Sequence, residues 1–403
     1  MKYAEDGNAQ SRVKLFLLSS AALYGFFFVY DSPSPMFPEL KKTFGEDYAA
    51  SHSLLYSAYA LPNLLLPLIT STSLKLSTSK TMLYTFLLIV LGQGLVWGGC
   101  YSELFAVIVA GRFVIGLGGE SFSVAQNKML SSLFHSHEYG RVFGVSLAIA
   151  RMGSITAYLL LGRLVTQGIP LCAGIGFGLI LVCGFLCYLI DREWQPGDVV
   201  LNNQTTNQEN HFLLPHMLSV TLLVACAVSP FSGASSAILQ QRLSVSYETT
   251  SRILAIQEGV SLVSTVVISI LTDKYGHRLS CVTLGSLLLS LGHALILSSI
   301  KLSYLPSLLI GISNGLLACC WPCIPLLISP NNLAVGLSLL SCGINLAYTI
   351  CPPLLSRLTD PGYTISEYYT VLISACAAFT SLFIVFVNES RGYGLNGKRT
   401  PKI

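Results

Sequence analysis

The sequence predicts an all-α membrane protein whose chain crosses the bilayer twelve times, in two halves of six helices each. Of its 403 residues, 52% are hydrophobic and only 10% are charged, whereas a soluble domain carries about 25% charged residues. The mean hydropathy of +0.65 agrees with this. Long unbroken apolar runs recur along the chain, and each can supply the roughly 20 residues of a spanning helix. These observations exclude a soluble enzyme, a disordered chain, a nucleic-acid-binding protein and an outer-membrane barrel.

Six apolar runs form the expected N-terminal half, residues 1–190. They are Val13–Pro38, Ser53–Leu76, Thr81–Cys100, Leu104–Leu133, Gly140–Val165 and Leu171–Ile190. The first run leads onward without a small-residue cleavage site, so we expect a span and not a cleaved signal peptide.

A polar linker, residues 191–212, separates this half from the second half, residues 213–403. The second half holds six further runs and a short tail. They are Leu213–Leu239, Tyr247–Leu271, Cys281–Ile300, Leu305–Ile328, Leu333–Leu355 and Tyr368–Asn388.

Basic residues in the loops predict the orientation of the chain. They are about twice as frequent on the side that carries the N-terminus, which predicts that both termini and the linker are cytosolic. Nearly all of the 12 cysteines lie within apolar runs, where cysteine acts as a small buried hydrophobe. The sequence shows no metal cluster, catalytic triad or phosphate-binding loop. We therefore expect no metal, no cofactor and no enzymatic activity.

Two motifs carry a functional signal, and the first lies between the eighth and ninth spans. The segment 269–278 reads S-I-L-T-D-K-Y-G-H-R. Asp273 can accept from the positive N-terminus of a neighbouring helix, Gly276 permits a tight turn, and Arg278 supplies a cation. We expect these residues to act in gating.

The second motif is in the fourth span, at residues 111–121. Arg112 with Gly116 and Gly118 places a cation and two close-packing positions within the membrane. A charge at this depth costs several kcal/mol (about 3 or more) unless it is paired or solvated, so Arg112 must face the interior of the bundle. With the six-plus-six architecture, both motifs resemble those of the major facilitator superfamily.

A narrower resemblance is to the lysosomal dipeptide uniporter branch of that superfamily, and it is densest in the fourth and fifth spans. The matching segments are residues 112–113, 118–121, 124–127, 142–144 and 150–154, with 30–33, 62–63, 230–231, 317–318, 321–322 and 345–346 elsewhere. The resemblance implies facilitated export of dipeptides, preferentially cationic ones, from the lysosome lumen to the cytosol by alternating access. It also implies the lysosomal membrane as location and a glycosylated single-span protein as accessory partner. The plasma membrane or another endomembrane stays open.

Glu120 and Arg151 are the strongest candidates for substrate binding. They lie in adjacent spans, well away from the ends. A dipeptide presents an ammonium and a carboxylate, and a glutamate and an arginine across a cavity can hold both of them. The resemblance implies these same roles. The alternative is a structural salt bridge between Glu120 and Arg151 without a ligand.

Other polar or aromatic residues within spans complete the candidate set. Trp321 beside Pro322 is expected to cover a ligand side chain or cation, and Tyr30, Tyr59 and Asn345 are expected to exchange hydrogen bonds with the ligand. Glu258 is a candidate proton or cation site, with a side chain that extends toward Arg252 as the alternative.

Two other functions stay open. The chain could be a proton-coupled carrier of another small organic solute, or a sensor or scaffold with a carrier fold that does not transport.

Overall fold

The fold is described from a computed structural model, and all of its regular secondary structure is helical in the residues described. These are residues 2–45, 48–73, 77–135, 138–194, 213–298, 304–329, 332–358, 362–392 and 395–396. Of the expected linker, residues 191–193 complete a helix, and residues 195–212 lie outside the described residues.

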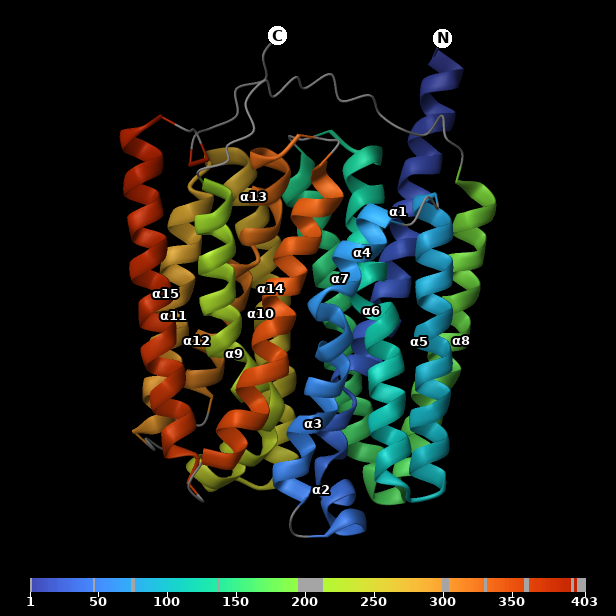
Figure 1. The fold of residues 1–403 in the computed structure, drawn as a ribbon, viewed down its shortest axis with the longest axis vertical. Coiled ribbons are helices and arrows are strands. Elements are labelled where there is room, and N and C mark those ends of the chain that lie inside the picture. Colours follow the sequence, from blue (N-terminus) through green and yellow to red (C-terminus); the bar gives the residue numbers. More distant parts are fainter. Residues whose placement is uncertain are drawn as a thin grey trace.

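The helices form two groups that stand side by side (Figure 1). The N-terminal group contains α1 (Lys2–Asp31), α2 (Pro33–Phe44), α3 (Tyr48–Ala60), α4 (Leu66–Ser73), α5 (Thr78–Tyr101), α6 (Phe105–Leu133), α7 (Tyr139–Leu164) and α8 (Ile169–Glu193). The C-terminal group contains α9 (Leu213–Leu243), α10 (Tyr247–Tyr275), α11 (Arg278–Leu297), α12 (Leu305–Leu317), α13 (Cys320–Leu327), α14 (Leu333–Leu358) and α15 (Thr364–Ser390). We call the end of the bundle where α1 begins and α15 ends the upper end, and the end that holds α2 the lower end.

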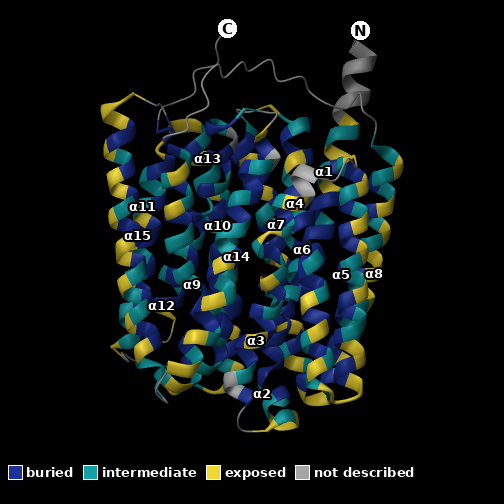
Figure 2. Ribbon diagram, viewed as in Figure 1, coloured by how far each residue is buried: buried dark blue, intermediate teal, exposed yellow. Residues whose placement is uncertain are grey.

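Eleven helical segments of the described chain are long and apolar enough to cross a membrane, with α1 and α2 counted together as Gln10–Phe44. The broken segment from α3 to α4 makes a further crossing, from the lower end to the upper end. The fold is therefore the expected all-α bundle of twelve crossings. Its outer helices carry many exposed apolar side chains, as on α15 at Phe379, Phe386 and Leu372, where a bilayer would cover them (Figure 2).

Two of the expected spans are broken at prolines. The second span is interrupted by a 3₁₀ turn at Leu61–Leu64, which contains Pro62. The tenth span breaks at Ala318 and Cys319, before α13. There Pro322 has no N–H to give to the carbonyl of Ala318, which accepts from the N–H of Trp321 at 3.2 Å instead. Trp321 follows directly after this break.

The two groups meet mainly where α7 packs against α10 and where α3 and α4 pack against α14. At the lower end, Ser34 of α2 lies 3.1 Å from Ser236 of α9, Oγ to Oγ. At the upper end, Ser338 of α14 donates to the carbonyl of Pro67 in α4 at 2.9 Å. The groups thus touch at both ends, on either side of the central region described next.

Candidate functional site

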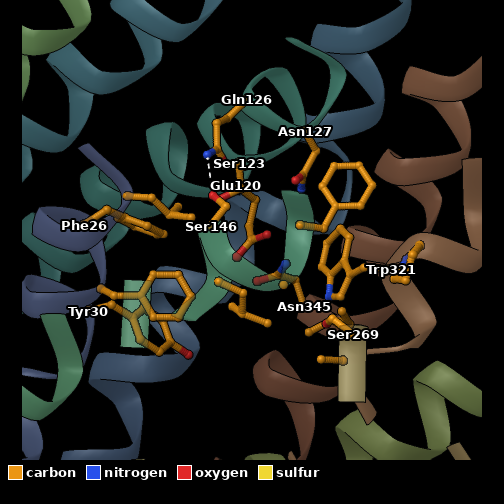
Figure 3. A pocket seen from close by; sticks show the side chains of 18 of the residues that line it. Phe26, Tyr30, Glu120, Ser123, Gln126, Asn127, Ser146, Ser269, Trp321 and Asn345 are labelled. Carbon is orange, nitrogen blue, oxygen red and sulfur yellow. Dashed lines mark hydrogen bonds between the residues drawn. The ribbon is translucent and has the colours of Figure 1, made fainter. Parts of the chain in front are cut away.

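A cavity of about 250 Å³ lies between the two groups, toward the upper end (Figure 3). Residues of α1, α3, α6 and α7 line it on one side, and residues of α10, α13 and α14 on the other. Five of the six predicted substrate-binding residues are among them. These are Tyr30, Tyr59, Glu120, Trp321 and Asn345.

Among the described residues that line the cavity, Glu120 is the only one with a charged side chain. Its two oxygens accept hydrogen bonds from opposite sides. The hydroxyl of Tyr59 donates to Oε1 at 3.0 Å, and Ser341 of α14 donates to Oε2 at 2.8 Å. Asn345, one turn further along α14, donates to the carbonyl of Ser341 at 2.9 Å. Glu120 therefore connects both groups of helices and supplies a negative charge to the space between them.

Aromatic side chains surround this carboxylate. Tyr30 and Tyr59 pack edge to face with ring centroids 4.8 Å apart, and Phe26 joins them from α1. Trp321 faces them from α13 (Figure 3). Aromatic faces and a carboxylate both attract a cation, so the cavity has the chemistry to bind an ammonium group.

The upper part of the cavity is polar without charge. Gln126 of α6 donates to Oγ of Ser146 at 2.9 Å, and Ser123 and Asn127 add further hydrogen-bonding groups. Sequence reasoning missed these residues and Ser341. Ser123, Gln126 and Asn127 fall at helical spacing after Glu120 in the fourth span, a signal that could have revealed them. Serine is too common in these spans to have pointed to Ser341.

Arg151, the sixth predicted binding residue, does not line the cavity. Its Nη1 lies 2.6 Å from Oε2 of Glu258 on α10, and both side chains are mostly buried, at 15% and 16% exposure. The alternative of a Glu120–Arg151 salt bridge is therefore wrong, because Glu258 takes the arginine. The alternative of a Glu258 that extends toward Arg252 is wrong as well, since Arg252 pairs with Glu248 one turn before it, at 2.5 Å.

Arg112 lies in the interior of the N-terminal group, with 1% of its surface exposed. Its Nε donates to the carbonyl of Leu55 and its Nη1 to that of Val29, both at 3.1 Å. The carbonyl of Val29 is available because Pro33, four residues on, has no N–H. Three tyrosine rings, of Tyr30, Tyr56 and Tyr59, lie 5.5 Å from the guanidinium carbon. This arrangement holds α1, α3 and α6 together.

Gly116 and Gly118 let α6 approach its neighbours. A Cβ at Gly116 would lie 2.1 Å from the carbonyl oxygen of Tyr59, and one at Gly118 equally close to that of Thr85. Both residues therefore serve packing in this conformation.

The loop motif joins the two groups at the upper end. Oδ2 of Asp273 accepts from the backbone N–H of Arg141, in the first turn of α7, at 2.9 Å. Arg278 donates to Oδ1 of the same carboxylate at 3.0 Å. Gly276 ends α10 with a φ of 81°, which favours glycine. A Cβ at Gly140 would lie 2.1 Å from Oδ1 of Asp273, so that residue must also be small.

Comparison with known proteins decides the family. The profile of the Major Facilitator Superfamily matches residues 15–215 and 217–402, which is nearly the whole chain. The chain belongs to the major facilitator superfamily. Among its relatives, the human protein named "Lysosomal dipeptide transporter MFSD1" is 26% identical over 96% of this chain and 88% of its own length. The zebrafish (Danio rerio) protein of the same name is 24% identical over 93% and 86%.

Solved structures agree on the major facilitator fold. The human organic anion transporter MFSD10 (TETRAN) superposes with a TM-score of 0.71 at 14% identity, over 93% of this chain and 99% of that one. FucP in its outward conformation gives a TM-score of 0.63, also at 14% identity, with the same coverage. At such identity these two structures support the fold and not a substrate.

Proposed function

We propose that this protein transports dipeptides by alternating access, with Glu120 as the group that binds the substrate ammonium. The observation that carries the proposal is a single carboxylate among aromatic rings, in a cavity between the two halves of a major facilitator fold. Relatives named as dipeptide transporters support the choice of substrate.

Arg151 is proposed to hold the substrate carboxylate. Gly144 and Leu147 line the cavity, and Arg151 follows Leu147 by four positions on the same helix. Arg151 therefore lies on the same face of α7 as these two residues. Along the axis of α7, the backbone of Arg151 is about one turn, or 5.4 Å, beyond that of Leu147. The ammonium and the carboxylate of a dipeptide are separated by roughly two residues of extended chain, about 7 Å. A dipeptide bound to Glu120 and pointing toward the lower end would bring its carboxylate toward Arg151.

The remaining roles follow the same proposal. Trp321, Tyr30, Tyr59 and Asn345 would position the rest of the substrate, and the uncompensated charge of Glu120 favours cationic dipeptides. Transport would be facilitated diffusion from the lysosome lumen to the cytosol, with the upper end cytosolic. A glycosylated single-span partner at the lysosomal membrane belongs to the same proposal, and co-purification of the tagged chain from lysosomes would test it.

Flux into liposomes tests the proposal. The purified chain should move a panel of dipeptides down their gradient, with cationic dipeptides fastest. Glu120→Gln should lower this flux about tenfold or more, because the ammonium loses a charged hydrogen-bond partner. Glu193→Gln, which breaks an exposed pair with Lys14, is the matched control and should keep wild-type flux.

The same preparation separates the other two functions. Flux that depends on a pH gradient would contradict facilitated diffusion and indicate a proton-coupled carrier, in which Glu258 is the residue to test. Tight binding of dipeptides without any flux would indicate a sensor. Equal flux by Glu120→Gln and wild type would contradict the role of Glu120.

A further inference from the structure

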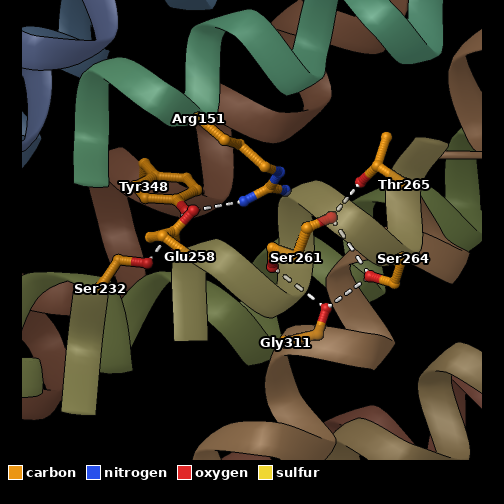
Figure 4. A network of polar contacts seen from close by, with 8 residues as sticks. All are labelled: Arg151, Ser232, Glu258, Ser261, Ser264, Thr265, Gly311 and Tyr348. Atoms are coloured by element: carbon orange, nitrogen blue, oxygen red, sulfur yellow. Dashed lines mark hydrogen bonds and ion pairs between the residues drawn. The ribbon is translucent and has the colours of Figure 1, made fainter. Parts of the chain in front are cut away.

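The Arg151–Glu258 ion pair lies in the middle of the interface between the two halves of the molecule. α7 and α10 pack antiparallel along their lengths, which successive close approaches demonstrate. A Cβ at Gly144 would lie 2.3 Å from Oγ of Ser269, and one at Gly162 would lie 3.3 Å from Oγ of Ser251. The ion pair falls between these two positions, where large charged side chains replace the small residues (Figure 4).

The hydrogen bonding of Arg151 is incomplete. One nitrogen, Nη1, donates to Glu258, while Nε is buried and has no hydrogen-bond partner. A guanidinium can hold a carboxylate through two parallel hydrogen bonds. Arg151 therefore retains donors for a second carboxylate that approaches from the cavity.

Polar groups near Glu258 can stabilise its carboxylate after the ion pair with Arg151 breaks. Tyr348, a cavity residue, lies near Glu258, and its hydroxyl is 3.2 Å from Oγ of Ser232 (Figure 4). The hydroxyl of Tyr348 can donate a hydrogen bond to a carboxylate, whereas that of Ser232 donates to the carbonyl of Val228 at 3.3 Å. Tyr348 thus lines the cavity and also lies near the ion pair.

We propose that Glu258 competes with the carboxylate of the substrate for the guanidinium of Arg151. When a substrate binds, its carboxylate displaces Glu258. This inference rests on the proposed dipeptide function and adds a residue to it. Without substrate, Glu258 holds Arg151 and ties α7 to α10. When a dipeptide binds, its carboxylate pairs with the guanidinium, and the Arg151–Glu258 ion pair between the halves breaks. Only a substrate with a free carboxylate can make this exchange, so Glu258 lowers the affinity for dipeptides but not the affinity for their amides.

The test compares binding of lysylalanine and of its C-terminal amide to the purified full chain. In Glu258→Gln the competitor has lost its charge, so the ratio of acid to amide affinity should rise about tenfold or more over wild type. The two ligands share both ammonium groups, so the ratio cancels the effect of the lost negative charge on those groups. Glu248→Gln, which breaks the exposed Glu248–Arg252 pair on the same helix, should keep the wild-type ratio.

A second variant covers the case in which Glu258→Gln does not fold. Glu258→Asp keeps the charge but shortens the side chain by one methylene, and it should also raise the ratio. An unchanged or lower ratio in a folded variant would overturn the competitor role.

Flux of lysylalanine by the wild type is measured in the same preparation. If the wild type transports this dipeptide but the Glu258 variants keep the wild-type ratio of acid to amide affinity, only the competitor role is overturned. Absence of flux overturns the proposed function, and the affinity ratio still decides whether Glu258 competes for Arg151.

Discussion

Arg112 illustrates how one buried charge is made tolerable at the residue scale. The sequence predicted that it faces the interior, because a charge exposed to lipid would be too costly. It did not predict the partners, which are backbone carbonyls and tyrosine rings and not an acid. Carbonyl acceptors leave no pattern in a sequence. Once the structure is known, Pro33 explains one of them, because it has no N–H to donate to the carbonyl of Val29.

We predict that Arg112→Met unfolds the N-terminal half or leaves it marginally stable. The variant keeps the volume of the aliphatic chain but leaves the carbonyls of Val29 and Leu55 without their donor. The expected loss is about 3 kcal/mol or more, measured as a lower melting temperature and a smaller yield of monodisperse protein. Arg192→Met removes another arginine that contacts a tyrosine ring, Tyr188, but on the exposed surface, and should have little effect. Equal stability of the two variants would contradict a structural role for Arg112.

At the scale of helices, the apolar runs predicted where spans lie but not where they break. Pro62 and Pro322 were visible in the sequence, yet proline in a span can equally leave a continuous bent helix. Glycines four apart in a span, such as Gly94 and Gly98 or Gly140 and Gly144, are a similarly ambiguous signal. Gly144 packs closely against α10, whereas a Cβ at Gly98 would have nothing within 4 Å. Which face of a helix meets a neighbour depends on the rotation of whole helices, and one sequence does not encode that in a local pattern.

Gly116 and Gly98 form a matched pair for a test of helix packing. Gly116→Ala places a methyl group against backbone, the carbonyl oxygen of Tyr59, which cannot move without shifting α3. We expect a loss of about 1–3 kcal/mol. Gly98→Ala meets open space and should be neutral or slightly stabilising, since alanine favours helix. Thermal unfolding of both variants in the same detergent measures the difference, and comparable melting temperatures would refute the packing role of Gly116.

At the scale of the whole molecule, the sequence predicted the family and five of the residues that line the cavity, but not the contacts between the halves. Tyr30, Tyr59, Glu120, Trp321 and Asn345 meet in one cavity although they come from five separate spans. The partner of Arg151 could not be predicted, because it lies 107 positions away in the other half. Such pairs depend on how two rigid halves dock, which follows from the shape of both interfaces together.

The closed lower end gives the most direct test of alternating access. Ser34 of α2 and Ser236 of α9 lie 3.1 Å apart at Oγ, and Ser236 also donates to the carbonyl of Ser34 at 3.3 Å. Cysteines at both positions would therefore be close enough for a disulfide. If the halves must separate here during each cycle, oxidation of the double variant Ser34→Cys, Ser236→Cys should lower dipeptide flux about tenfold or more, in proportion to the cross-linked fraction.

Reduction should restore the flux of that double variant, because the chain itself is unaltered. The two single variants, oxidised in the same way, control for disulfides with the native cysteines and should transport normally. Full flux through cross-linked protein would mean that the lower end does not open between α2 and α9. The substrate would then have to leave the cavity by another route, and alternating access by separation of the two halves at the lower end would be contradicted.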